Sequence, residues 1–389
     1  MTGTPVDFDL HGILRLRLLD ARPGDVAVVE RQLGPLRQPA QGDADITVRF
    51  VDSLPTASAL TFVGFREAGF DSESFYLLKG HQGVSARTAL PFADVGGRCD
   101  IVAERGAGAV PHLLAIVNLT ALGKGVLPLH ASAFVLDGQG VLATGWSKGG
   151  KTETLLAFAA RGASYIGDEW IYLSAEGDMV GVPEPTRLWY WHLRQLPHVW
   201  ERFSPLTRAR LTGLDAAARA ADRLAALLPE RSGVGSVLRR GAPVVQRQAF
   251  RKVSPRDLFG ADGRASRARL DALLLVTSHD RDDVVVEPVT GDLVAEMMRA
   301  SLIEERAMFL AHYRQFRFAF PDRRSDVVER ADEIEAKLLT RLFAGRAAYQ
   351  VKHPYPFRLD TIVEPVTAAL KDLADAQTAM TTGNHGGQP

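Results

Sequence analysis

The pattern of apolar and polar residues changes near residue 105. Before that point the two kinds alternate with the two-residue period of half-buried strands, most clearly over residues 13–19 and 46–51, and residues 24–33 have a helical pattern. Shorter strand candidates are residues 60–65 and 74–78. This part of the sequence carries no recognisable nucleophile, metal cluster or phosphate loop. We therefore expect a small α+β N-terminal domain, residues 1–105, that serves in docking, assembly or substrate presentation.

Beyond residue 105 the pattern predicts strands and helices in close succession. Residues 111–121 are a candidate apolar helix that links the two parts of the chain. Two apolar runs, residues 127–136 and 141–144, flank an Asp137-Gly138 turn. Because an Asp-Gly turn between apolar runs is typical of a β-hairpin, these two strands should be antiparallel neighbours.

The rest of the chain alternates long helical stretches with short apolar runs. Helical patterns cover residues 197–228, 290–314 and 324–343, whereas residues 231–245, rich in Gly and Arg, are predicted to form a loop. Strand candidates are residues 270–276, 284–286, 348–352 and 357–362, ahead of a last helix. We expect a second domain over residues 106–368, with a helical insertion near 197–252, and a helix end with a disordered tail over 369–389.

A phosphate-binding motif follows the second strand of the hairpin. It matches the Walker A pattern G-x-x-x-x-G-K-[ST], and the residues predicted to bind nucleotide are Gly145, Trp146, Ser147, Lys148, Gly149, Gly150, Lys151 and Thr152. Backbone N–H groups of such a loop surround phosphate oxygens, and the N-terminus of the following helix, residues 151–160, adds positive potential. Lys151 should reach the β- and γ-phosphates, and the Thr152 hydroxyl should bind Mg²⁺. ATP and Mg²⁺ are therefore the expected cofactors.

Composition excludes several other classes of protein. The 389 residues contain 46 Lys plus Arg and 46 Asp plus Glu, so the net charge gives no reason to expect nucleic acid as a partner. Cys99 is the single cysteine, and the ten histidines form no ligand-spaced cluster, which argues against a disulfide or a zinc site. The sequence begins without a signal-peptide pattern and has no apolar run long enough for a bilayer span. We expect a soluble cytoplasmic protein without membrane partners, and a homo-oligomer is left open.

The neighbours of the phosphate loop are more specific than the loop itself. In order they are His130-Ala131-Ser132, the hairpin, the loop continued by Glu153, a short helix ending in Arg161-Gly162, and Gly167-Asp168-Glu169. This set resembles the HPr kinase/phosphorylase family, closely over residues 127–170 and loosely over 107–366. The resemblance implies an α/β fold, with a P-loop HPr kinase/PEP carboxykinase-like mixed sheet and flanking helices behind the small α+β N-terminal domain. Glu169 stands where the family has a second aspartate.

The resemblance also implies roles for individual residues. Asp168 is the expected general base or metal-coordinating acid, because a carboxylate near Mg²⁺-bound phosphate can accept the proton of an attacking hydroxyl. Glu169 either binds the metal or supports Asp168. Glu153 is expected to have a Mg²⁺-linked role, although an acid in a first helical turn is favoured by the helix dipole anyway. His130 matches a family histidine near the transferred phosphate. Without that match, a lone histidine in an apolar strand would be interpreted as a structural residue.

Some residues keep alternative interpretations. Asp280 follows a predicted buried strand and is a rival ligand for Mg²⁺, but Thr277, Ser278 and His279 intervene. The Arg251-Lys252 pair is interpreted as a solvated basic turn, with binding of a substrate phosphate as the alternative. Trp189 and Trp191, two residues apart, are predicted to pack in the core from one face of a strand. Trp146 should point away from the phosphates and is free to stack on a base or a substrate.

The leading hypothesis is an ATP-dependent kinase. In it Lys151, Asp168 and His130 are the catalytic residues, Thr152 with Glu153 or Glu169 positions Mg²⁺, and the acceptor is a serine-type hydroxyl of an unknown protein, peptide or small molecule. The alternatives are a nucleotide-binding regulatory or scaffold protein without phosphotransfer, and an ATPase that uses Asp280.

Overall fold

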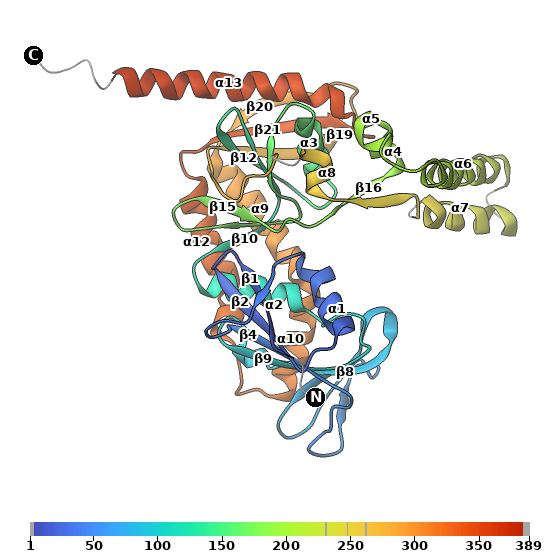
Figure 1. Cartoon of the computed structure of the whole chain (residues 1–389), viewed down its shortest axis with the longest axis vertical. Coiled ribbons are helices and arrows are strands. Elements are labelled where there is room, and N and C mark those ends of the chain that lie inside the picture. The colour runs from blue at the N-terminus through green and yellow to red at the C-terminus, as the bar shows by residue number, and fades with distance from the viewer. Residues whose placement is uncertain (1–3, 230–231, 247, 261–262, 384–389) are drawn as a thin grey trace, which may run out of the picture.

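The chain forms two lobes, a helical arm and a long C-terminal helix (Figure 1). This computed structural model describes residues 4–229, 232–246, 248–260 and 263–383. The end of the tail predicted over 369–389, residues 384–389, lies outside the described residues. The molecule is a mixed α/β protein with several sheets and flanking helices. None of its described helices is both long and apolar enough to cross a membrane.

The N-terminal lobe is built on a nine-stranded sheet. Its strands are β1 (Val6–Leu10), β2 (Leu14–Leu19), β3 (Arg37–Pro39), β4 (Ile46–Val51), β5 (Thr61–Val63), β6 (Ala68–Phe70), β7 (Phe75–Lys79), β8 (Ser85–Ala89) and β9 (Cys99–Glu104), in the spatial order β3-β1-β2-β4-β9-β8-β7-β6-β5. Helices α1 (Pro23–Leu33) and α2 (Leu113–Gly123) pack beside it (Figure 1). The alternating pattern found the strands at 13–19 and 46–51 because only one of their faces is buried, as the burial of β2 and β4 shows.

The second lobe contains a six-stranded sheet in the order β13-β11-β12-β19-β21-β20. These strands are β11 (Ser132–Leu136), β12 (Gln139–Thr144), β13 (Ser164–Gly167), β19 (Ala272–His279), β20 (Val285–Val289) and β21 (Ala347–Pro354). The predicted hairpin is confirmed, because β11 pairs antiparallel with β12, while β12 pairs parallel with β19. The run 127–136, predicted as one strand, is two strands that belong to different sheets.

Two smaller sheets complete the β-structure of the second lobe. One has the order β10-β14-β15-β18, formed by β10 (Leu127–His130), β14 (Trp170–Leu173), β15 (Asp178–Gly181) and β18 (Ala268–Arg269). The other is a two-stranded ribbon of β16 (Thr186–Trp189) and β17 (Phe250–Val253). Between these last two strands the chain leaves the lobe to form the helical arm (Figure 1).

The helices correct three sequence predictions. They are α3 (Lys151–Ala159), α4 (Tyr190–Arg194), α5 (Pro197–Trp200), α6 (Pro205–Leu227), α7 (Gly233–Gln246), α8 (Pro255–Phe259), α9 (Gly291–Glu305), α10 (Ala307–Ala319), α11 (Asp326–Glu329), α12 (Ala331–Phe343) and α13 (Leu359–Gly383). The loop predicted over 231–245 was wrong, since α7 lies along α6 in the arm, and packing overrides the weak helix propensity of glycine (Figure 1). The strand predicted over 357–362 was also wrong. Leu359, Ile362, Val363 and Val366 are buried at helical spacing on α13.

The third correction concerns residues 290–314, predicted as one helix. The chain forms two helices that meet at Arg306, whose backbone N–H still bonds to the Leu302 carbonyl. The Arg306 guanidinium is buried and contacts the carboxylates of Glu335 and Asp332 on α12. This buried ion pair fixes the place where the chain turns from α9 into α10.

One hydrophobic core joins the two lobes. A continuous cluster runs from the N-terminal sheet through α2 to β10, β14 and the helices α9 to α12. On α10, Phe309 and Phe316 pack against Phe92 of the N-terminal lobe, and the Ser325 hydroxyl donates to the Val95 carbonyl at 2.6 Å. A second cluster lies between the six-stranded sheet, α3 and α13. The boundary predicted near residue 105 stays a prediction, and in space residues 307–328 pack on the N-terminal lobe.

The buried Arg306 pair gives a prediction about stability. Replacing Arg306 with Met leaves Glu335 buried without its counter-charge, and should lower the free energy of unfolding by about 3–5 kcal/mol. Arg299→Met, on α9 just before Arg306, removes only an exposed pair with Glu296 and should cost less than about 1 kcal/mol. Urea unfolding of the two variants measures the difference, and equal losses would contradict a structural role for Arg306.

Candidate functional site

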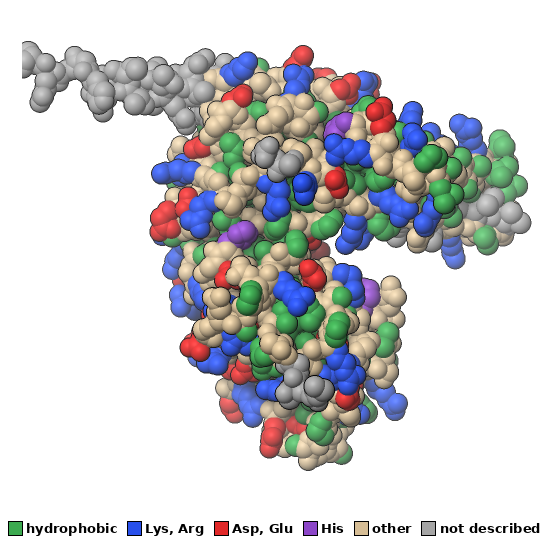
Figure 2. Space-filling model, viewed as in Figure 1, with side chains coloured by type: hydrophobic (Ala, Val, Ile, Leu, Met, Phe, Trp, Pro, Cys, Tyr) green, Lys and Arg blue, Asp and Glu red, His purple; other side chains and the backbone are tan. Residues whose placement is uncertain are grey.

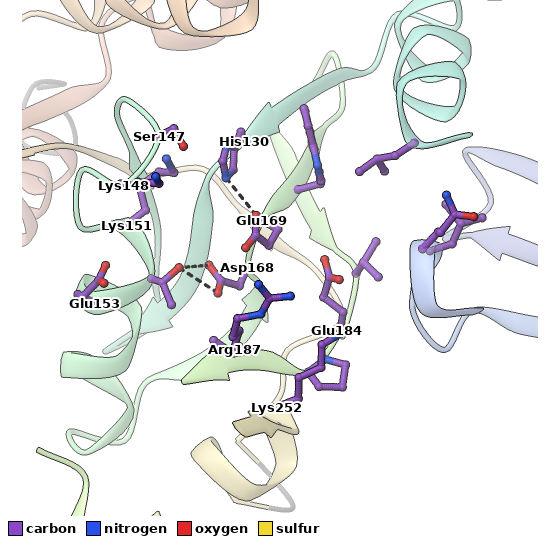
Figure 3. A pocket seen from close by; sticks show the side chains of 18 of the residues that line it. His130, Ser147, Lys148, Lys151, Glu153, Asp168, Glu169, Glu184, Arg187 and Lys252 are labelled. Carbon is purple, nitrogen blue, oxygen red and sulfur yellow. Dashed lines mark hydrogen bonds and ion pairs between the residues drawn. The ribbon is translucent and has the colours of Figure 1, made fainter. Parts of the chain in front are cut away.

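A cavity of about 760 Å³ lies between the two lobes. One end is formed by the phosphate loop and α3, the middle by the ends of β13 and β14 and by the β16–β17 ribbon, and the other end by β1, β2, α1 and α2 of the N-terminal lobe. Asp215, near the base of the arm, also lines it. Figure 2 shows the surface hollowed between the arm and the N-terminal lobe. Figure 3 shows the side chains that point into the cavity.

The phosphate loop has a backbone that only glycine permits at two positions. Gly145 and Gly150 have φ values of 145° and 104°. A Cβ on Gly150 would lie 2.5 Å from His353 Nε2, and one on Gly145 would lie 2.4 Å from the Val276 carbonyl oxygen. The loop is therefore held tightly against β19 and β21, which bear Val276 and His353. His353 Nε2 also lies 2.8 Å from the Gly149 carbonyl oxygen.

Lys151 begins α3 and bends back over the loop. Its ammonium group donates to the carbonyls of Gly145 and Trp146 at 3.2 and 3.0 Å. Lys151 is only 6% exposed, and this burial lowers its pKa against the opposing effect of Glu305, Glu169, Asp168 and Glu153. The lysine is thus a buried cation surrounded by acids, at the end of the cavity formed by the loop.

Asp168 is the residue that connects the loop to the rest of the site. It follows β13 directly, and its carboxylate accepts hydrogen bonds from Ser132 on β11 at 2.5 Å and from Thr152 on α3 at 3.1 Å. Burial, and secondly the charge of Glu169, raise the pKa of Asp168 to about 6. The prediction that the acidic pair lies near the loop is thereby confirmed. Ser132 was not predicted as a site residue. The sequence feature that could have identified it is its position two residues after His130.

His130 lies between two carboxylates rather than against the loop. Its Nε2 lies 3.2 Å from Glu169 Oε2, its Nδ1 contacts Glu305, and Trp170 stacks on the ring with the centroids 5.8 Å apart. Burial alone would lower the pKa of His130, but the hydrogen bonds to Glu169 and Glu305 outweigh it and raise the pKa to about 9. His130 is therefore a cation at neutral pH. Glu305 comes from α9, 175 positions away, and no sequence pattern predicted this contact.

Glu153 has its own histidine partner. Its carboxylate lies 3.0 Å from His192 Nε2, while His192 Nδ1 accepts from the Trp189 backbone N–H at 3.1 Å. This pairing fixes the tautomer, since Nε2 then carries the proton and donates it to Glu153. Burial would raise the pKa of Glu153, but the hydrogen bond from His192 lowers it. Glu153 remains an ionised acid at the cavity wall.

Two cations face the cavity from the β16–β17 ribbon. Arg187 lies directly opposite Lys252 in the register, so both side chains leave the same face of the ribbon. Neither side chain forms a salt bridge with another described residue, and the Arg187 guanidinium lies over the Phe250 ring, 4.9 Å from its centroid. Like charges placed opposite each other destabilise a ribbon, which favours a role in holding an anion. The basic turn predicted at Arg251-Lys252 was wrong because both residues lie in β17, and Arg187 was not predicted at all.

The structure separates the remaining predicted residues into two groups. Ser147, Lys148, Gly150, Lys151 and Thr152 line the cavity, as do Glu153, Asp168, Glu169 and His130. Gly145, Trp146 and Gly149 do not line it, and Trp146 is 54% exposed. Asp280 is exposed beyond the end of β19 and does not line the cavity either. No group of three or more His, Cys, Asp or Glu residues suited to a metal is found within the described ranges.

The tryptophans also differ from their prediction. Trp189 ends β16, whereas Trp191 lies in α4, so they do not share one strand face. Both line the cavity, and Trp191 stacks on His192 with the ring centroids 3.6 Å apart. The shared strand face predicted for this pair was therefore wrong, whereas the predicted packing against the core is confirmed for Trp191. The two indoles also contribute aromatic surface to the site.

Comparison with known proteins gives little further information. No protein-family model matches the sequence, and no curated protein matches it. A solved structure to which the chain is similar is the HPr(Ser) kinase/phosphatase from Coxiella burnetii, at 13% sequence identity and a TM-score of 0.26, over 67% of this chain and 99% of that one. A likeness at that score carries no argument, so the function proposed below depends on the geometry of the site.

The tight approach at Gly150 gives a second prediction. Gly150→Ala adds a Cβ into His353, so it should cost about 1–3 kcal/mol of folding stability for backbone strain and about 1–3 kcal/mol more for overpacking. Gly138→Ala is the matched control, because Gly138 also has a positive φ but open space around it, and only the strain should appear. Urea unfolding compares the two. A Gly150 variant as stable as the Gly138 variant would show that the approach is not tight.

Proposed function

We propose that the protein is an ATP-dependent kinase that transfers the γ-phosphate to a serine-type hydroxyl of a protein, peptide or small molecule. The observation that carries the proposal is the buried carboxylate of Asp168 at hydrogen-bond distance from Thr152 of the phosphate loop. It places a proton acceptor beside the position where the loop would hold the terminal phosphates.

In this proposal the nucleotide binds at the phosphate-loop end of the cavity. Backbone N–H groups at the start of α3 would surround the phosphate oxygens, and Lys151 would exchange its carbonyl partners in the loop for the β- and γ-phosphates. Arg187 and Lys252, on the facing ribbon, would stabilise the negative charge of the phosphoryl group during transfer. These groups are already oriented by the fold, so binding need not create the charged environment.

The residues around Thr152 fit a magnesium ion. Mg²⁺ prefers oxygen ligands, and the Thr152 hydroxyl lies near the carboxylate of Asp168, with Glu153 and Glu169 also on the cavity wall. Thr152 with Glu153 or Glu169 would hold the ion. When bound, Mg²⁺ would neutralise part of the phosphate charge.

Asp168 would act as the general base. As the acceptor hydroxyl approaches the γ-phosphorus, its proton passes to Asp168, the bond from the γ-phosphorus to the bridging oxygen breaks, and ADP leaves. A pKa of about 6 leaves Asp168 ionised at neutral pH, yet more basic than an ordinary aspartate. The charged His130 would orient Glu169 and add positive potential near the transferred group.

Removing the lysine of the loop should weaken nucleotide binding and abolish transfer. Lys151→Ala deletes the one ammonium group among the loop residues that is buried against the loop carbonyls. We expect the affinity for a fluorescent ATP analogue with Mg²⁺ to fall at least about tenfold, and transfer from γ-labelled ATP to be lost. Arg161→Ala, which removes an exposed cation just beyond α3 and outside the cavity, is the control and should keep the binding. A Lys151 variant that binds ATP normally would contradict this role.

Removing the proposed base should separate binding from transfer. Asp168→Asn should bind the ATP analogue as the wild type does but transfer the γ-label to acceptor about 10²–10⁴-fold more slowly, and Asp280→Asn, at an exposed acid, should transfer normally. The acceptors tested are the purified products of neighbouring genes, with mass spectrometry of whichever gains a phosphate. Full activity of Asp168→Asn would contradict the role of Asp168 as general base. ATP binding by the wild type with no transfer at all would favour the regulatory, nucleotide-binding alternative.

A further inference from the structure

The cavity extends well beyond what a phosphate loop needs. Its far end is apolar and belongs to the N-terminal lobe, where Leu14, Leu16, Leu33, Leu36, Leu114 and Val117 line it. These residues come from β2, from α1 and the turn after it, and from α2. The N-terminal lobe therefore lines the same cavity as Lys151 and Asp168 (Figure 3).

Direct contacts between the lobes fix the positions of the two ends of the cavity relative to each other. His11 Nε2 lies 2.8 Å from the Gly181 carbonyl oxygen of β15. A Cβ on Gly34, which ends α1 with φ 74°, would lie 2.5 Å from Val182 Cγ1. Because Val182 also lines the cavity, the N-terminal lobe meets the second lobe at the cavity wall itself. The apolar end is thus a fixed part of the site.

The apolar end is narrow. Leu14, Leu16 and Leu33 line it although they are 4%, 0% and 6% exposed, and only Leu36 and Leu114 are half-buried. The apolar surface that a ligand could reach at this end therefore comes from Leu36 and Leu114. An alkyl chain or a flat ring can lie against these two side chains, whereas the surface of a folded protein could not enter the space. The total volume of about 760 Å³ is within the roughly 300–1,000 Å³ typical of small-molecule sites.

The charged side chains determine which end of the cavity binds the nucleotide and which end binds the acceptor. Asp168, Glu169 and Glu184 lie between the phosphate loop and the apolar end, and burial together with Glu169 and Asp168 raises the pKa of Glu184 to about 7. Arg187 and Lys252 balance part of this negative charge, whereas the described lining residues from the N-terminal lobe include no charged side chain. A triphosphate at the apolar end would therefore lack a counter-charge, and the nucleotide is confined to the end with Lys151. A neutral hydroxyl can lie at Asp168 with its apolar part directed toward the N-terminal lobe.

We propose that the acceptor is a slim amphipathic alcohol, and that the N-terminal lobe is its binding domain. The inference rests on the proposed kinase function and names its substrate class. The hydroxyl oxygen forms a bond to the γ-phosphorus, the bond to the β–γ bridging oxygen breaks, ADP leaves, and the hydroxyl proton goes to Asp168. The product is a phosphate monoester of the alcohol.

The test uses the full chain with γ-labelled ATP, Mg²⁺ and unbranched primary alcohols from ethanol to octanol as probe acceptors. Burying each added methylene should raise kcat/KM for alkyl phosphate formation about three- to fourfold, until the apolar end is filled. Mass spectrometry measures the alkyl phosphate. The KM for ATP should not change with chain length.

Matched variants test whether the apolar end causes the dependence of kcat/KM on chain length. Leu36→Ser and Leu114→Ser place a hydroxyl on half-buried positions of the apolar end, and should flatten the dependence on chain length and lower kcat/KM for octanol about tenfold. Phe65→Ser alters an apolar residue of the same lobe that is 95% exposed and away from the cavity, and should behave as the wild type. Thermal unfolding checks that each variant is folded. The dependence of the transfer rate on octanol concentration then measures the effect of each substitution on the binding site alone.

The outcomes separate the inference from the function on which it rests. If the wild type transfers phosphate to a protein or to water but forms alkyl phosphates at a rate independent of chain length, or forms none, the inference is overturned and the kinase function stands. Competition between octanol and a non-hydrolysable ATP analogue would also overturn it, because the nucleotide would then occupy the apolar end. Absence of both ATP binding and transfer would overturn the kinase function itself.

Discussion

The buried carboxylate of Asp168 is the interaction on which the site depends. An ionised acid that is 3% exposed is costly unless hydrogen bonds replace its water, and here Ser132 and Thr152 supply them. The two donors come from β11 and α3, and Asp168 itself follows β13, so one group fixes three elements relative to one another. The same hydrogen bonds that satisfy the carboxylate hold it beside the phosphate loop. Stability of the fold and position of the proposed base therefore have a common physical cause.

The shared core of the two lobes explains why the cavity has two unlike ends. The hydrophobic cluster runs without a break from the N-terminal sheet through α2 to the strands behind the site, and α10 and α11 return to pack on the first lobe. If the N-terminal lobe were a separate docking domain on a flexible linker, the shape of the cavity would vary. Here the wall made by the N-terminal lobe is held in place by the shared core and by direct contacts with the second lobe. This favours a role for the lobe in binding a reactant over a role in assembly alone.

The sequence predicted what depends on local chemistry and missed what depends on tertiary contact. The hairpin and the phosphate loop were predictable because an Asp-Gly turn and closely spaced glycines impose their own backbone conformation. Glu305, Arg187 and Ser132 were not, since their roles come from elements that meet only in the fold. Helix α7 was missed for the same reason: its glycines disfavour a helix, and only packing along α6 stabilises it.

The charges along the cavity impose an order on whatever binds there. Lys151 at one end is followed by the acids Asp168, Glu169 and Glu184 and by the cations Arg187 and Lys252 of the facing ribbon, before the apolar wall begins. The hydrogen bond to His130 is the main reason that the pKa of Glu169 is lowered, and Arg187 adds to this effect, while Lys252 opposes the rise in the pKa of Glu184 that burial causes. Arg187 also lies over the Phe250 ring, 4.9 Å from its centroid. A charge in such a position is available to a ligand because no ion pair has to be broken first. Both signs of charge therefore face the middle of the cavity, whereas the described lining residues of the N-terminal lobe are uncharged. The polar and the apolar part of a bound molecule would accordingly lie at different ends.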